Sequence, residues 1–284
     1  MGFIRRYSKN ERLIPLAEEI EEGIWRDMAE FYNPDMRNFC GPYSRAYEMD
    51  MAVHTCFCDM LYWALGEEAF PWHPFSTESV INPLMLLGDI RIPDDVKRAF
   101  LTSKQDAVLC HRFRELSERG DPESNSSLCT ATGWITPELM TGALSGSKNP
   151  SHQLHPLVVF WKQNSGLGTI KLLRCLPDGT MNHLHTVYFD GKADRNHLTM
   201  DIQVDVRRDV DVFFEIEGEN MTNARIAENE WRLPGLAVHV CAQAPLPECR
   251  KINERVIRVV YPARIDDPSS LRMHFDLTVE RREE

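Results

Sequence analysis

The chain lacks the motifs that mark most nucleotide-, cofactor- and zinc-dependent enzymes. It contains no GxGxxG, no GxxxxGKS/T, no GxSxG and no HExxH. These motifs hold phosphates at a helix N-terminus, a serine on a strained turn or two histidines on zinc. Dinucleotide, nucleotide, α/β-hydrolase and zincin activities therefore have no support in the sequence, and we expect no cofactor.

The eight cysteines lack the spacing of a metal site or a disulfide framework. No two of them form a CxxC pair, and they are spread along most of the chain. This distribution favours free or buried thiols in a reducing compartment, with disulfide bonds as the alternative. We expect no metal site. His183 and His185 would share one face of a strand, but no Asp or Glu at ligand spacing completes a set.

Long apolar runs and an excess of basic residues are also missing. No stretch is apolar over the roughly 20 residues that a membrane-spanning helix needs, and residues 1–12 do not read as a secretory signal. Lys and Arg number 32 against 43 Asp and Glu, a formal net charge of −11 that repels nucleic acid and anionic lipid. We expect a cytoplasmic protein that binds neither nucleic acid nor membrane, although a local basic groove is compatible with an anionic substrate.

The 284 residues are enough for one large domain or two of ordinary size, and an apolar content of 43% is typical of globular chains. Apolar residues at three- and four-residue spacing predict an amphipathic helix over Glu11–Tyr32, ended by Asn33-Pro34. A second helix, apolar on nearly all sides, is predicted over Tyr43–Leu65. A weaker helical pattern follows over Pro93–Ser117.

The residue composition changes after the polar segment GDPESNSS at residues 120–127. Runs of β-branched and aromatic residues between turn signals then predict strands, and their spacing favours an antiparallel sandwich over a parallel α/β sheet. The predicted strands are Leu157–Lys162, Gly168–Leu176, Asn182–Phe189, His197–Asp205, Val210–Glu217, Leu236–Cys241, Arg255–Tyr261 and Leu271–Glu280. We expect an α+β protein with a helical domain at residues 1–120 and an antiparallel β-sandwich at residues 128–284.

The densest polar cluster in an apolar setting is GPYSRAYEMDMAVH, in the second predicted helix. Four of its residues follow one another at spacings of four, three and four, which places them on one helix face with Arg45 beside them. The four are Tyr43, Tyr47, Asp50 and His54. Tyr and His transfer protons, Asp fixes the imidazole tautomer and Arg neutralises a carboxylate, so these five residues are the candidate catalytic set. The alternative is a structural role inside a core.

Trp134, His152 and His155 are the candidate substrate-binding residues. An exposed indole can stack on a sugar ring, and the two histidines of SHQLHP can form hydrogen bonds with a substrate. The alternative for Trp134, as for Trp161 and Trp231, is a place in the core of the sandwich.

The order of the segments resembles that of one group of carbohydrate-active proteins. Helices around Gly-Pro-Tyr-Ser-Arg-Ala-Tyr, followed by HQLHPLVVFW and a β-rich half, look like the C-terminal part of (α/α)-toroid plus β-sandwich proteins. Six-hairpin glycosidase-like proteins and heparinase II/III-type lyases share this plan. The resemblance implies a truncated toroid, because about 125 residues hold only about three to five helices. It also implies that Tyr47 or Tyr43 transfers a proton, His54 is the partner base and Arg45 binds a uronate carboxylate.

These observations favour a carbohydrate-active enzyme, either a polysaccharide lyase or a glycoside hydrolase. One alternative is a catalytically silent protein that binds a glycan or a protein partner. Another is a cofactor-independent lyase, isomerase or cyclase that acts on a small molecule. The substrate, the bond cleaved and the oligomeric state are left open, since a fold by itself does not define them.

Overall fold

The computed structural model divides the chain into two compact units, which are described separately. The first comprises Met1–Phe39 and Met49–Lys104, and the second comprises Cys40–Glu48 and Gln105–Glu284. The structure describes residues 1–46, 61–62, 65–66, 88, 90–115, 127–149, 151, 153–181, 187–205 and 207–282.

The first unit is built on the amphipathic helix that the sequence predicts. This helix, α2 (Leu13–Phe31), buries Trp25 on one face. Trp25 meets Phe100 of α5 (Asp94–Leu101) edge to face, with ring centroids 6.2 Å apart. The other elements of this unit with described bounds are α1 (Gly2–Tyr7), β1 (Tyr32–Asn33) and β2 (Asn38–Phe39).

The prediction of a toroid-like helical domain is wrong. Within the described residues only α1, α2 and α5 form complete α-helices, and antiparallel β-strands hold far more residues than the helices do. The helix predicted over Pro93–Ser117 ends at Leu101, and Ala107–Arg114 form strand β3 instead. Every residue of β3 has a partner on β4 (Leu128–Ile135), and this ladder of backbone hydrogen bonds outweighs a weak helical pattern.

The second predicted helix does not begin at Tyr43. Residues 43–46 are non-helical, and residues 47–60 lie outside the described part of the chain. The backbone N–H of Tyr43 donates to the His155 carbonyl at 3.1 Å, and the His155 N–H donates to the Tyr43 carbonyl at 2.8 Å. A β-bridge to a residue far along the chain therefore replaces the first helical turn.

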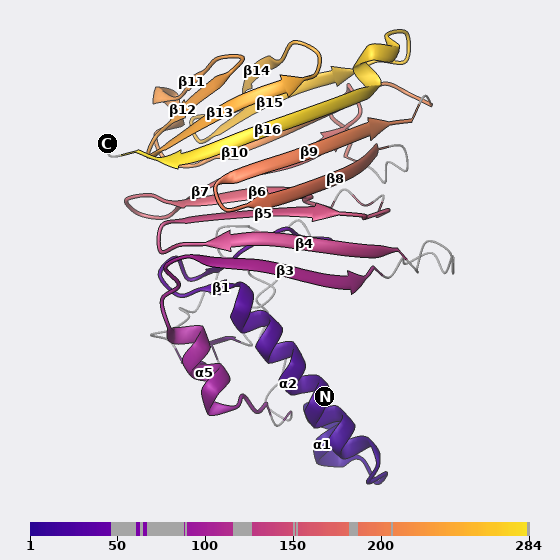
Figure 1. The fold of residues 1–284 in the computed structure, drawn as a ribbon, viewed down its shortest axis with the longest axis vertical. Coiled ribbons are helices and arrows are strands. Elements are labelled where there is room, and N and C mark those ends of the chain that lie inside the picture. The colour runs from indigo at the N-terminus through magenta and orange to yellow at the C-terminus, as the bar shows by residue number, and fades with distance from the viewer. Residues whose placement is uncertain are drawn as a thin grey trace. The chain divides into compact units, whose positions relative to one another are not determined.

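The second unit is an antiparallel β-sandwich, as predicted for the C-terminal half (Figure 1). The predicted boundary at residues 120–128 falls between β3 and β4, which pair with each other in one sheet. The larger sheet has the order β14 (Glu248–Lys251), β15 (Val256–Ala263), β10 (Val210–Glu217), β7 (Leu167–Cys175), β6 (Leu157–Lys162), β5 (Leu139–Ser145), β4 and β3. The smaller sheet has the order β11 (Arg225–Ile226), β12 (Glu230–Leu233), β13 (Leu236–Gln243), β16 (Arg272–Arg281), β9 (His197–Val204) and β8 (Val187–Asp194).

Alternating side chains of both sheets meet in one apolar core, because each strand turns every second residue away from water. Phe214 of β10 contacts Trp231 of β12 and Phe275 of β16, both with ring centroids 5.2 Å away. Trp161 of β6 is fully buried as well, and its Nε1 donates to the Pro234 carbonyl at 2.9 Å. Trp161 and Trp231 are therefore core residues, which was the alternative left open by the sequence.

The edge strand β8 of the smaller sheet is joined to the larger sheet by side-chain hydrogen bonds. The Ala193 N–H donates to the hydroxyl of Thr132 on β4 at 2.8 Å. The hydroxyl of Thr141 on β5 donates to the Arg195 carbonyl at 2.7 Å. An unpaired strand edge exposes backbone donors and acceptors, and the two threonines satisfy part of this edge.

Residues 40–46 lie on the outer face of β4, β5 and β6, in contact with glycines. A Cβ on Gly142 would lie 2.0 Å from the Gly41 carbonyl oxygen, and a Cβ on Gly41 would lie 2.0 Å from Val158 Cγ2. The thiol of Cys40 donates to the Thr141 carbonyl at 3.1 Å. The close approach of these two backbones requires glycine at both positions.

We predict that Gly142→Ala destabilises the sandwich, by about 2–4 kcal/mol, because the new methyl group has no room against rigid backbone. Gly166→Ala is the matched control, since its nearest neighbour would be Glu219 Oε1 at 3.7 Å. Urea unfolding of the two variants beside the wild type measures the difference. Equal unfolding midpoints for all three would contradict the close packing of residues 40–46 on β5.

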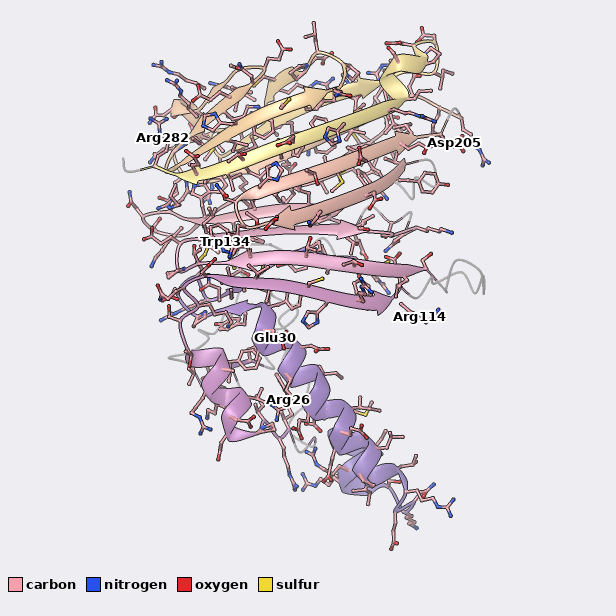
Figure 2. All side chains as sticks on the ribbon, viewed as in Figure 1. Arg26, Glu30, Arg114, Trp134, Asp205 and Arg282 are labelled. Carbon is pink, nitrogen blue, oxygen red and sulfur yellow. The ribbon has the colours of Figure 1, made fainter. Side chains whose placement is uncertain are left out.

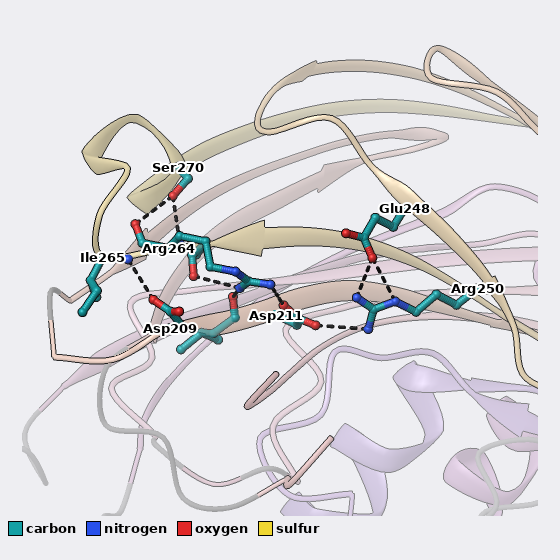
Figure 3. A network of polar contacts seen from close by, with 9 residues as sticks. Asp209, Asp211, Glu248, Arg250, Arg264, Ile265 and Ser270 are labelled. Atoms are coloured by element: carbon teal, nitrogen blue, oxygen red, sulfur yellow. Dashed lines mark hydrogen bonds and ion pairs between the residues drawn. The ribbon is translucent and has the colours of Figure 1, made fainter. Parts of the chain in front are cut away.

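A buried carboxylate joins the strands at one end of the larger sheet (Figure 3). Asp211, with a side chain only 1% exposed, accepts from Arg264 Nη2 at 2.8 Å and from Arg250 Nη1 at 3.1 Å. Arg250 also pairs with Glu248 at 2.6 Å on the surface. The contacts connect β10, β14 and the end of β15, and they leave the Asp211 charge paired on both sides.

Replacing Asp211 by Asn should cost about 2–3 kcal/mol, because two arginines lose the charge that compensates for their partial burial. Glu248→Gln removes an exposed partner of the same Arg250 and should cost less than about 1 kcal/mol. The comparison is made by urea unfolding at low salt, because urea is uncharged and does not screen the ion pairs. A loss for Glu248→Gln as large as that for Asp211→Asn would rule out burial as the cause.

Candidate functional site

The structure places two of the five candidate catalytic residues. Tyr43 lies in the extended bridge to His155, with its ring edge to face on Phe160 at a centroid distance of 6.5 Å. Arg45 is exposed two residues further on. Neither residue is on a helix, so the helical stripe does not begin where the sequence predicts. Three candidates of this set lie outside the described residues, namely Tyr47, Asp50 and His54.

The structure describes two of the three candidate substrate-binding residues, Trp134 and His155. His155 is buried in the bridge to Tyr43, and His152 lies outside the described residues, as do His183 and His185.

Trp134 lies on β4 (Figure 2), and its Nε1 donates to Asp106 Oδ1 at 2.6 Å. This hydrogen bond, followed by one from Arg195, lowers the pKa of the Asp106 carboxyl. The indole N–H of Trp134 is therefore already used within its own unit.

A different set of residues gathers on the outer face of the smaller sheet. The strand register places polar side chains next to one another across β13, β16, β9 and β8, while their neighbours in sequence point into the core. We call this surface the polar face. Its members are Tyr188, Asp190, Lys192, Asp194, His197, Thr199, Asp201, Gln203, His239, Cys241, Gln243, Arg272, His274, Asp276 and Thr278.

Two histidine–aspartate pairs cross the polar face. His274 Nδ1 lies 2.8 Å from Asp201 Oδ1, and His197 Nε2 lies 2.7 Å from Asp276 Oδ1. Asp201 also stands directly opposite Asp190 on the next strand, an arrangement of like charges that is unfavourable by itself. The hydrogen bond from His274 offsets part of this repulsion. It also fixes the orientation of the imidazole, which is how carboxylates position functional histidines.

A surface pocket of about 650 Å³ opens at one end of the polar face. Its floor is formed by strands rather than loops, so its side chains are held by the pairing of β8, β9 and β16. Tyr188 presents an exposed ring there, while carboxylate, amide, guanidinium and imidazole groups lie beside it. The pocket is lined by six members of the polar face that hold these groups, namely Tyr188, Asp190, Asp201, Gln203, Arg272 and His274.

Residues 146–148 form the rim of the pocket, and a buried carboxylate holds them. Glu115 accepts from the Ser147 hydroxyl at 2.9 Å and from the Lys148 backbone N–H at 3.1 Å. Gly146 adopts a positive φ of 78°, and a Cβ there would lie 2.5 Å from the Leu128 carbonyl oxygen. The rim is therefore fixed by a buried acceptor and by a backbone conformation that favours glycine.

Arg174 lies behind this rim and is almost fully buried. Its Nη2 donates to the Ser151 carbonyl at 2.9 Å, and its guanidinium stacks on Phe189 at 5.1 Å from the ring centroid. Burial lowers the pKa of Arg174 to about 10. Because Phe189 also lines the pocket, Arg174 connects the pocket wall to the segment that follows the rim.

The fold and the site define the second unit as an antiparallel β-sandwich with a rigid polar pocket on one sheet. Residues 1–81 of the chain match the family model of a domain of unknown function, DUF8769. The match includes α1, α2 and residues 40–48 of the second unit, and it ends before α5 and before the strands from β3 onward. No curated protein and no solved structure matches the chain.

Two further findings concern the described residues. None of the helices in this part of the chain combines the length and apolar character needed to cross a bilayer. In the same residues, no three His, Cys, Asp or Glu side chains are grouped closely enough to hold a metal ion.

The sequence contains a signal for the polar face, although it does not identify the pocket. Leu198, Met200 and Ile202 alternate with polar residues in the sequence, and β9 accordingly has one buried and one wet face. The wet residues of β9 become a site only beside His274, which follows Asp201 by 73 positions. Sequence periodicity carries no information on that pairing.

The cysteines give a direct test of which faces are open. Cys110 and Cys241 are exposed free thiols, whereas burial raises the pKa of Cys40 and of Cys129 to about 12. We predict that iodoacetamide at pH 8 alkylates the first two and spares Cys40 and Cys129 until the protein is unfolded, because the thiolate is the nucleophile. Peptide mass spectrometry assigns each site, and alkylation of native Cys40 as fast as Cys110 would contradict this burial.

Proposed function

We propose that the pocket on the polar face binds a carbohydrate without covalent chemistry. The observation that supports this most is the exposed ring of Tyr188 beside planar hydrogen-bonding groups on three paired strands, around a pocket of about 650 Å³. A volume between roughly 300 and 1,000 Å³ is usual for small-ligand sites. A sugar presents an apolar C–H face for stacking and hydroxyl pairs for carboxylate, amide and guanidinium groups.

The charges in the pocket favour a neutral or mixed-charge glycan over a strongly anionic one. Asp190 and Asp201 stand opposite each other, while Arg272 and Lys148 supply positive charge at the same end. A phosphate-rich ligand would meet the two carboxylates at close range, at a cost that the two cations only partly offset. Hydroxyl groups have no such conflict, because they donate to carboxylates and accept from Arg272 and Lys148.

A preorganised floor supports binding affinity directly. The side chains stand on paired strands, and the rim is tied to the buried Glu115, so little conformational entropy is lost when a ligand binds. The catalytic alternative, a lyase or hydrolase that uses the cluster around Tyr43, stays a prediction because Tyr47, Asp50 and His54 lie outside the described residues. The binding proposal depends on described residues alone.

We predict that Tyr188→Ala and Gln203→Ala each weaken glycan binding about tenfold, because each removes stacking area or hydrogen bonds from the pocket floor. A glycan array identifies a ligand, and isothermal titration then gives the dissociation constants. Leu246→Ala is the control, since Leu246 is exposed and lies outside the pocket lining.

A product assay with the same glycans distinguishes binding from catalysis. It follows reducing ends and unsaturated products in parallel for the wild type and for His274→Gln. Steady product release that is lost in His274→Gln would replace the binding proposal with acid–base catalysis by the His274–Asp201 pair. No binding to any glycan by a cooperatively folding protein would refute the proposal.

A further inference from the structure

The exposed large apolar side chains of the described chain are concentrated at its N-terminus. Most of the surface carries such residues singly, for example Leu128 and Leu246, which is normal for a soluble protein. The first 24 residues hold eight of them. They are Met1, Phe3, Ile4, Tyr7, Leu13, Leu16, Ile20 and Ile24.

Four of these residues lie along one side of α2, next to but distinct from its buried face. Leu13, Leu16, Ile20 and Ile24 follow one another at spacings of three, four and four, so they lie along one side of the helix. The face of α2 that packs into the first unit is formed by Ala17, Glu21, Trp25 and Ala29. The helix is therefore apolar on two sides, and the described residues of its own unit cover only one of them.

The other four exposed apolar residues are Met1 and three residues of helix α1, which is fixed beside α2. The guanidinium of Arg5 pairs with the Glu21 carboxylate, and both side chains are largely buried. Glu21 also accepts from the Arg91 backbone N–H at 3.1 Å. Phe3 and Tyr7 stack on each other at a centroid distance of 6.0 Å. We call the eight exposed residues the apolar stripe.

A glycine in the middle of α2 supplies a second observation. Glycine in a helix interior costs roughly 0.5–1 kcal/mol relative to alanine. Gly23 has no packing reason for this cost within the described residues, since a Cβ there would meet nothing within 4 Å. Gly23 lies beside the stripe, on the open side of the helix. A residue without a side chain at this position lets the backbone of another helix approach closely.

We infer that the apolar stripe is a homodimer interface, in which α2 of one copy packs antiparallel on α2 of a second copy. The exposed area of the eight side chains is roughly 700 Å² per copy, so pairing two copies would bury about 1,400 Å², within the range of stable interfaces. A two-fold axis across α2 places the same stripe on both sides of the contact, as an isologous interface requires.

The distribution of charge favours the antiparallel orientation. The basic residues Arg6, Lys9 and Arg12 lie at the N-terminal end of the stripe, whereas Asp27 and Glu30 lie at its C-terminal end. Antiparallel packing brings each basic end next to the acidic end of the other copy, while parallel packing would place like charges together.

The charge of α2 also disfavours a lipid surface as the occupant of the part of the stripe that lies on α2. Apolar helices that bind anionic membranes carry Lys and Arg on their polar side. The only basic residue of α2 is Arg26, which already pairs with Glu22 at 2.6 Å and with Asp95 at 2.8 Å. The acidic residues of α2 are Glu18, Glu19, Glu21, Glu22, Asp27 and Glu30.

The experiment is sedimentation velocity of the full chain from 1 to 100 µM. We expect a dimer for the wild type, and for Leu16→Gln/Ile20→Gln a dimer dissociation constant raised at least a hundredfold. Leu128→Gln/Leu246→Gln is the matched control, because it also replaces two exposed leucines and should leave the dimer intact. Circular dichroism and thermal unfolding establish that each variant is folded.

Gly23→Ala separates helix stability from the interface. Alanine should raise the helicity and the unfolding temperature, yet weaken the dimer at least tenfold if the second helix approaches at this position. Tighter association of Gly23→Ala would contradict the proposed close approach. A wild-type monomer at 100 µM, or a chain that floats with phosphatidylserine vesicles and does not self-associate, would overturn the inference.

Discussion

The structure of the second unit depends on the contact between the inner faces of its two sheets. Phe214 from one sheet meets Trp231 and Phe275 from the other, and every strand that contributes to this core must turn its remaining side chains outward. The polar face is the outward half of that arrangement on the smaller sheet. The positions of Asp201 and His274 are therefore set by the packing of Ile202 and Phe275, their buried neighbours in sequence. Catalytic or binding side chains need such support, since small displacements are costly for function.

Local patterns in the sequence were sufficient for the elements that bury one face. The alternation in His197–Asp205 and the apolar runs at Leu157–Lys162 and Val210–Glu217 gave strands with bounds close to those of β9, β6 and β10. The amphipathic pattern of α2 was equally clear. The sequence failed where pairing decides the structure. Ala107–Arg114 became a strand because β4 lies beside it, and Tyr43 became extended because His155 pairs with it. Strand β4 follows β3 only after a long connection, and His155 lies far along the chain from Tyr43. Local propensity therefore carries no information on either pairing.

The site was less predictable than the fold, for a related reason. Tyr43, Arg45 and Trp134 were selected because chemically versatile residues lie near one another in sequence or stand out in composition. The pocket instead combines residues of β8, β9 and β16 that are individually ordinary. What makes them a site is the strand register, which places Asp201 between Asp190 and His274. A one-residue slip would turn all three into the core, so the register is held by the apolar half of each strand.

The position of β16 has a consequence for biosynthesis. This strand is the last one in the sequence, yet it lies between β13 and β9 in the smaller sheet rather than at an edge. Until residues 272–281 have left the ribosome, β9 and β13 have no partner between them, and the four members of the polar face on β16 are missing. Between the synthesis of β9 and that of β16 the growing chain therefore carries an open strand edge, and β13 adds a second one. Such edges are prone to mispairing until β16 joins them. Completion of the sheet and appearance of the pocket are a single late event.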